Sequence, residues 1–173
     1  QNGQNCLSAT AVLATPGRAG ALPVAAMMPH TPAPGTCPIL NVPPEVVAFA
    51  WRTEIRPVGV TRPYQGGERA ELLAWLRFTQ DDVPPDEERL VVLMDSLAPS
   101  YAALLDAPKA IPTLTYSVTF GGDLTTATSP WILLRARTEL GSDDGWLHER
   151  LDAWTPEGVH LACSEQLRVV RGG

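Results

Sequence analysis

The C-terminal half of the chain contains four strand-like runs joined by short polar connections, and this feature restricts the possible folds most. Each run is rich in aromatic, β-branched and leucine residues; the runs cover residues 113–120, 131–138, 146–154 and 159–170. Turn-forming residues such as glycine, proline and aspartate fill the connections, at residues 121–123, 141–145 and 155–158. Because parallel strands need long crossovers, these short connections predict an antiparallel meander.

A buried helix is predicted just before these strands. Two prolines and three acidic residues at 84–88 form its start, where the acids complement the positive end of the helix dipole. One apolar stripe follows, made of Leu90, Leu93, Met94 and Leu97. Val91 and Val92 add apolar character to the opposite side, so the helix is apolar nearly all round and is expected to be buried. Pro99 should interrupt it, and residues 101–105 should add a short extra turn.

Two further strand-like runs precede the predicted helix. They cover residues 46–56 and 70–79, lack helical caps, and are separated by a connection that contains Gly66 and Gly67. One helix with two strands before it and four after it predicts an α+β fold in which an antiparallel sheet curls around the helix. This is the hotdog architecture, and we expect it to occupy residues 45–173.

A proline-rich, weakly charged segment at residues 29–44 precedes this predicted domain. Residues before proline avoid the helical region, so the segment is expected to be an extended linker. Residues 1–28 contain two strand-like runs joined by a Thr-Pro-Gly turn, and the chain has no initiating methionine. The start of the sequence therefore looks like the middle of a longer unit.

Charge and composition argue against several classes of partner. The formal net charge is −6 and no basic run is present, so neither nucleic acid nor an anionic membrane surface is expected as a partner. The sequence has no apolar stretch of about 18 residues and no charged-then-apolar leader, which favours a cytoplasmic protein. Cys6, Cys37 and Cys163 lack metal-ligand spacing, so we expect neither a disulfide framework nor a metal site. Without a glycine-rich loop that opens a helix, no nucleotide cofactor is indicated.

Asp95 is a lone carboxylate in the apolar run 90–105. It lies about 140° around the predicted helix from Leu90, by the 3.6-residue period. An isolated acid usually faces water, so Asp95 taken alone is most simply a surface residue. On a buried helix, however, a carboxylate is a candidate catalytic group.

Gln166 lies in the last predicted strand. Alternation places it on one face with Ala162 and Ser164, whose small side chains would let a helix approach closely. From that face an amide could reach a carboxylate on the helix. A glutamine on a solvated face is the simpler interpretation of this residue alone.

Thr113 opens the first strand after the predicted helix. Alternation groups it with Thr115 and places it opposite Tyr116. A threonine in this position usually reflects β-propensity alone. Its hydroxyl could also donate to a water molecule held by Asp95 and Gln166, which would give three polar groups around one solvent molecule.

Three segments of the chain resemble one known family. They read LVVLMDSLAPSYAALL at residues 90–105, PTLTYSVTF at 112–120 and DGWLHERLDAWTPEGVHLACSEQLRVVR at 144–171. This pattern resembles the C-terminal half of the double-hotdog acyl-CoA thioesterases of the TesB-like family. The resemblance covers residues 46–171 well. It extends more loosely to residues 4–28, which look like the end of the family's first hotdog.

The resemblance implies a site and a reaction. The family carries Asp on the helix, Thr at the start of the next strand and Gln in the last strand, where they hold and activate the hydrolytic water. Asp95, Thr113 and Gln166 fall on these positions. The implied activity is hydrolysis of acyl-CoA to a free acid and coenzyme A without a cofactor, by a protein expected to form a dimer. The missing part of the first hotdog implies a fragment of a longer gene product.

Several alternatives remain open at this stage. Asp95 could attack the thioester directly and form an anhydride, and the chain could be a non-catalytic hotdog that binds acyl-CoA or serves in assembly. Hotdog hydratases and dehydratases are disfavoured, because they carry a histidine within a turn of the helix aspartate and residues 86–120 contain none. Four arginines could bind coenzyme A phosphates, although solvated strand positions are the simpler interpretation: Arg135, Arg137, Arg150 and Arg168. Surface or structural roles are favoured for His30, His148 and His160.

Overall fold

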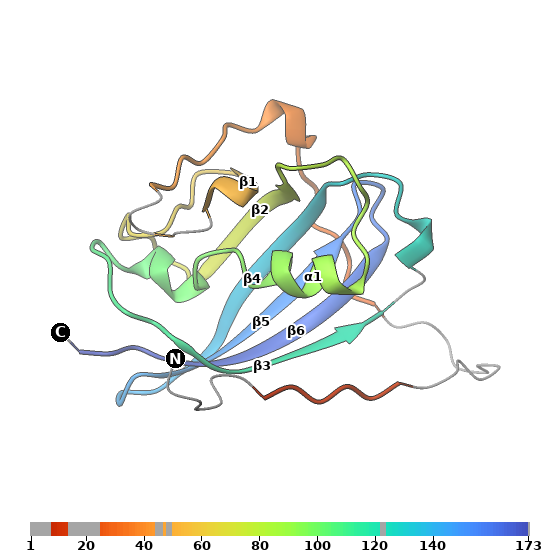
Figure 1. Cartoon of the computed structure of the whole chain (residues 1–173). Helices are drawn as coiled ribbons and strands as arrows, with labels where there is room; N and C mark the ends of the chain where they lie inside the picture. The colour runs from red at the N-terminus through yellow and green to blue at the C-terminus, as the bar shows by residue number, and fades with distance from the viewer. Residues whose placement is uncertain (1–7, 14–24, 44–46, 48–49, 122–123, 173) are drawn as a thin grey trace.

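A computed structural model describes residues 8–13, 25–43, 47, 50–121 and 124–172 of the chain. They form a six-stranded antiparallel sheet with the order β1-β2-β4-β5-β6-β3. The strands are β1 Thr53–Pro57, β2 Glu71–Phe78, β3 Thr113–Phe120, β4 Ile132–Gly141, β5 Trp146–Trp154 and β6 His160–Val169. The helices are α1 Glu87–Met94 and the short 3-10 turns η1 Pro34–Thr36, η2 Ala50–Arg52, η3 Ser100–Leu104 and η4 Leu124–Thr126. The curved sheet carries α1 across one face, which confirms the predicted hotdog fold (Figure 1).

The predicted meander is correct for β4, β5 and β6 but wrong for β3. The strand β3 pairs with β6 at the far edge of the sheet and does not neighbour β4. The chain between them, residues 121–131, contains η4 and is far longer than a hairpin turn. A connection of this length can cross the end of the sheet, whereas the prediction counted only the Gly-Gly-Asp turn at its start.

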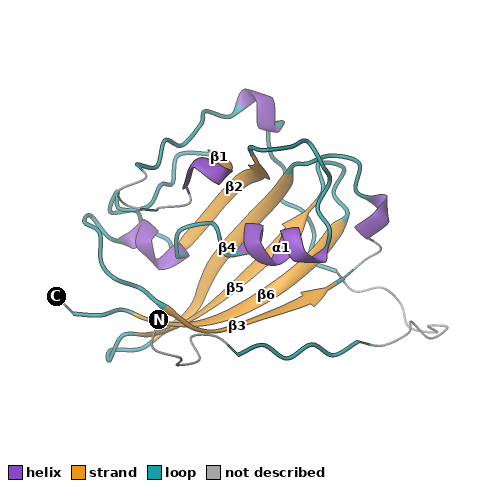
Figure 2. Ribbon diagram, in the orientation of Figure 1, coloured by secondary structure: helices purple, strands orange, loops and turns teal. Residues whose placement is uncertain are grey.

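Helix α1 forms where the sequence places its cap. The Asp86 side chain accepts a hydrogen bond from the Arg89 backbone N–H at 2.8 Å, and two acids occupy the first turn. The predicted burial on all sides is wrong, because Val91 and Val92 remain 37 % and 51 % exposed. The helix rests on the sheet through one side only, together with η3 on the same face (Figure 2).

The core fills the space between α1 and the sheet. It joins Leu90, Leu93 and Met94 of the helix to apolar residues of the strands, including Leu72 and Leu134. This burial fixes the helix over the sheet, since apolar area removed from water supplies most of the folding free energy. Consequently the end of α1 is held close to the strands β6 and β3.

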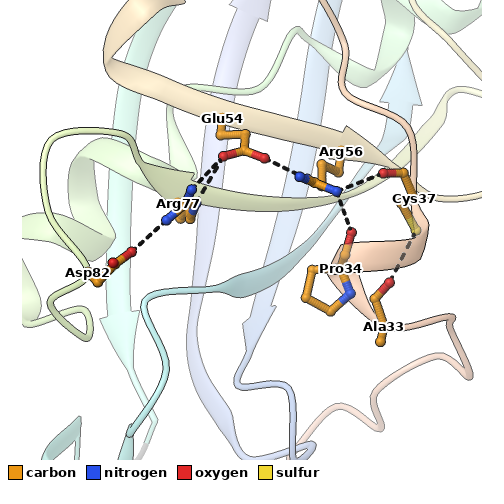
Figure 3. A network of polar contacts seen from close by, with 7 residues as sticks. All are labelled: Ala33, Pro34, Cys37, Glu54, Arg56, Arg77 and Asp82. Atoms are coloured by element: carbon orange, nitrogen blue, oxygen red, sulfur yellow. Dashed lines mark hydrogen bonds and ion pairs between the residues drawn. The ribbon is translucent and has the colours of Figure 1, made fainter.

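The described part of the segment predicted as an extended linker, together with Ala26 just before it, is packed on the outer face of the sheet. The Trp75 and Trp154 indoles donate to the backbone oxygens of Pro32 and Ala26, at 2.9 and 2.8 Å. The Arg56 guanidinium donates to the Pro34 and Cys37 oxygens, both at 3.1 Å, within a network that Figure 3 shows. These contacts join the segment to the domain, although it has the extended backbone expected of a proline-rich chain.

The proposed end of a first hotdog at residues 1–28 stays a prediction. Residues 1–7 and 14–24 lie outside the described residues. The described residues 8–13 are exposed and belong to no strand. The predicted strand 46–56 also lies partly outside the described residues, and its described part begins with η2 before β1 starts at Thr53.

Candidate active site

A bulge at the start of β3 decides where Thr113 points. Thr113 pairs with Arg168 and Thr115 with Leu167, so one extra residue, Leu114, lies between the two pairs. Thr113 therefore shares the helix side of the sheet with Tyr116, and the predicted alternation that separated them is wrong. Bulges commonly re-aim a side chain beside an active site, and this one turns the Thr113 hydroxyl inward.

Gln166 lies on the helix side of β6 and is fully buried, beside the small residues Ala162 and Ser164. Its amide oxygen accepts a hydrogen bond from the Thr113 hydroxyl at 3.1 Å. Its amide nitrogen donates to Asp95 Oδ1 at 3.2 Å. A hydroxyl at one end and a carboxylate at the other define the amide's orientation, because only its oxygen accepts and only its nitrogen donates.

Asp95 is the C-cap residue of α1 rather than a residue within the helix. The helix ends at Met94, so Asp95 follows its last residue. The Asp95 side chain is 50 % exposed. The expectation of a carboxylate inside a buried helix is therefore wrong. A carboxylate at the edge of the core can touch both the buried amide of Gln166 and solvent.

A buried ion pair lies beside these three residues. Arg168 Nε donates to Glu149 Oε2 at 2.6 Å, and the two side chains are 7 % and 1 % exposed. The same guanidinium lies 3.8 Å from Asp95 Oδ1 through NH2. The interpretation of Arg168 as a solvated strand residue is wrong. Strand alternation could have found it, since Arg168 lies two residues after Gln166 and so shares its face.

The pKa of Asp95 is raised above its usual value, mainly because burial disfavours the charged form. The Arg168 charge and the Gln166 hydrogen bond oppose this shift, whereas the Glu149 charge adds to it. Half of the Asp95 side chain still meets solvent. The hydrogen bond from Gln166 reaches Oδ1 of Asp95, and among the described residues no hydrogen bond reaches Oδ2.

Comparison with known proteins identifies the family. Residues 25–170 match the family described as acyl-CoA thioesterase C-terminal domain. The chain belongs to this family. A comparison with curated proteins finds no significant match.

Solved structures of several relatives share the hotdog fold with this domain. A hot dog fold protein of unknown function from Alicyclobacillus acidocaldarius has a TM-score of 0.78 and 24 % identity, over 90 % of this chain and 59 % of that chain. The tesB protein of Mycobacterium avium subspecies paratuberculosis has a TM-score of 0.62 and 18 % identity, over 87 % and 56 %. Acyl-CoA thioesterase II TesB2 of Mycobacterium marinum has a TM-score of 0.55 and 16 % identity, over 89 % and 59 %. The domain thus spans less than two thirds of each of these chains.

The described part of this thioesterase domain offers neither a metal centre nor a membrane span. No group of three or more His, Cys, Asp or Glu side chains in it is placed to hold a metal ion. No helix in the same part of the chain is long and apolar enough to cross a bilayer.

Tyr116 fixes the end of α1 against the edge strand β3. Its hydroxyl donates to the Val91 backbone oxygen at 2.8 Å, and Ser96 Oγ donates to the Val92 oxygen at 2.7 Å. These side chains satisfy carbonyls that the ended helix leaves without a partner. Burial, and then the nearby Asp95 charge, raise the pKa of Tyr116, so its hydroxyl stays a neutral donor at physiological pH.

Tyr116→Phe should loosen the end of the helix that carries Asp95. Loss of the hydrogen bond to Val91 should lower the free energy of unfolding by about 0.5–1.5 kcal/mol. Denaturant unfolding checks this value, and hydrogen exchange should be faster at the end of α1 than at its start. Ser117→Ala on the same strand is the matched control, since the structure gives Ser117 an exposed position on the other face. Equal stability of the two variants would contradict a pinning role for Tyr116.

Proposed function

We propose that this domain hydrolyses acyl-CoA thioesters to a free acid and coenzyme A, with a water molecule activated by Asp95, Gln166 and Thr113. One observation carries the proposal: the continuous hydrogen-bonded chain from Thr113 through Gln166 to Asp95. It joins residues from two strands and a helix end, which are far apart in the sequence. Membership of the acyl-CoA thioesterase family supports the same reaction class.

Each residue has a distinct part in this mechanism. The free Oδ2 of Asp95 accepts a proton as the water oxygen attacks the thioester carbonyl carbon. The tetrahedral intermediate then collapses, the C–S bond breaks, and the departing thiolate takes a proton from the Asp95 carboxyl. Gln166 orients the carboxylate through Oδ1, and Thr113 holds the amide of Gln166. General base catalysis of this kind contributes about 10²–10⁴-fold to the rate.

Thr113 acts through Gln166, so its removal should have a moderate effect. Thr113→Val keeps the shape of the side chain but removes its hydrogen bond to Gln166. We expect kcat to fall by about three- to tenfold, because one neutral hydrogen bond contributes roughly 1 kcal/mol. Thr115→Val is the matched control on the outer face of the same strand and should leave kcat unchanged. Equal kcat values for Thr113→Val and the unmodified domain would remove Thr113 from the mechanism.

Exposed apolar side chains lie on α1 and on the edge strand β3. They are Val91 and Val92 of the helix, and Leu114 and Phe120 near the two ends of β3. Within the described residues β3 pairs with β6 on one side alone, and an edge strand with exposed apolar residues favours pairing with another sheet. We therefore propose that a second hotdog unit pairs there in a dimer and helps to enclose the acyl chain.

A panel of acyl-CoAs of different chain lengths, with released thiol detected, tests the proposed activity. We expect release of thiol with at least one acyl class, together with an equal amount of free acid. Binding of acyl-CoA without release of thiol would favour the alternative, a non-catalytic acyl-CoA-binding or assembly module. If no acyl-CoA is bound or hydrolysed, both the proposed hydrolysis and an acyl-CoA-binding function are contradicted.

A further inference from the structure

The surroundings of Asp95 disfavour its ionised form. It caps the C-terminal end of α1, where the helix dipole presents partial negative charge. Burial and the Glu149 carboxylate also disfavour its charged form. A base must nevertheless be ionised to accept a proton from water, so the site requires a compensating positive charge.

Arg168 supplies that charge from a fixed position. Among the described residues it is the cation within ion-pair distance of Asp95, with its NH2 atom 3.8 Å from Oδ1. At this distance the contact is electrostatic rather than a hydrogen bond. The remaining groups that face Asp95 are Gln166 on β6, Tyr116 on β3 and Glu149 on β5. None of these supplies a positive charge.

Glu149 holds Arg168 back from Asp95. Its Oε2 accepts the 2.6 Å hydrogen bond from Arg168 Nε, and its Oε1 accepts the Ser100 backbone N–H. Ser100 is fixed in turn by a 2.9 Å hydrogen bond between its hydroxyl and that of Thr138. The guanidinium is therefore anchored to Glu149 through Nε, with its NH2 atom beyond hydrogen-bond distance of Asp95.

We propose that Arg168, balanced by Glu149, is a positioning residue that sets the charge state of Asp95 and so the pH range in which the site works. This inference rests on the proposed function for its catalytic meaning, but its electrostatic content is independent of substrate. The two buried charges act in opposite directions. Arg168 favours the ionised carboxylate, whereas Glu149 opposes it.

Three variants separate these effects. Glu149→Gln should move the titration of Asp95 to lower pH, because it removes a negative charge and leaves the cation. Glu149→Gln combined with Arg168→Gln should move it back to higher pH, and Arg168→Lys should keep it near that of the unmodified protein. Glu71→Gln is the control, since Glu71 pairs with Arg135 at 2.7 Å between other strands and should leave the titration unchanged.

The titration of the Asp95 carboxyl is measured by carbon-13 NMR, with its signal assigned by its absence in Asp95→Asn. In parallel, kcat/KM of the double variant should be about three- to tenfold below that of Glu149→Gln at acidic pH and should recover at alkaline pH. A general loss of structure would lower activity at every pH. The proposal is overturned if the Asp95 titration is identical in all variants. It is also overturned if adding Arg168→Gln to Glu149→Gln moves the titration further to lower pH. Opposite shifts without any release of thiol would support the electrostatic inference and defeat the proposed hydrolysis.

Discussion

Asp95→Asn should lower kcat for acyl-CoA hydrolysis by about 10²–10⁴-fold, the range that a positioned general base contributes. Asparagine has nearly the same shape and can accept the Gln166 hydrogen bond through its amide oxygen. It cannot take a proton from water at neutral pH. Thiol release under saturating acyl-CoA gives kcat for the two proteins. A variant with more than half of the original kcat would remove Asp95 from the mechanism.

The same variant should not be less stable at neutral pH. The folded state raises the pKa of Asp95, so folding favours the protonated carboxyl. The stability linked to this group is complete below the unfolded pKa of about 3.9 and is lost as pH rises through the higher folded pKa. Removing the charge should therefore keep or raise the thermal midpoint at pH 7. A lower thermal midpoint of Asp95→Asn at pH 7 would show that the substitution destabilises the fold. The loss of kcat could then not be assigned to the missing base.

Arg168→Met should destabilise the fold by about 3–5 kcal/mol, because it leaves the Glu149 carboxylate buried without its cation. Glu149 is 1 % exposed, so solvent cannot replace the lost partner. Urea unfolding measures the change directly. A loss below about 1 kcal/mol would mean that the ion pair behaves as a surface pair.

The double variant Glu149→Leu with Arg168→Met is the decisive control for this second result. Replacing both members of a buried pair by apolar residues of similar size is often neutral or stabilising. The double variant should thus be closer in stability to the unmodified protein than Arg168→Met is. The pair is not coupled if the changes in unfolding free energy of the two single substitutions add up to that of the double variant. The network around Asp95 would then need another explanation.

The sequence predicted most elements because local signals and tertiary structure agree in them. The predicted runs 113–120 and 146–154 coincide with β3 and β5, since turn residues limit both strands at each end. Alternation along β6 placed Gln166 beside Ala162 and Ser164 on the helix side, and the buried positions confirm it. Asp86 with the following acids marked the start of α1, where the cap hydrogen bond forms.

The errors arise where non-local pairing decides the structure. The turn-like start at Gly121 did not reveal that the following residues carry the chain past β6 and β5 to β4, in the interior of the sheet. Alternation alone could not show the bulge that turns Thr113 inward, because a bulge depends on the register with β6. The pairing of Glu149 with Arg168 likewise depends on the register between β5 and β6, which the predicted turn between these strands does not define.

A single turnover in oxygen-18 water, with an excess of enzyme over acyl-CoA, tests the central claim most directly. Water attacks the thioester carbonyl in the proposed mechanism, so mass spectrometry should find one oxygen-18 atom in the released acid and none in the peptide that contains Asp95. Oxygen-18 in that peptide together with unlabelled acid would show that Asp95 attacks the substrate and forms an anhydride, and would contradict the activated-water mechanism.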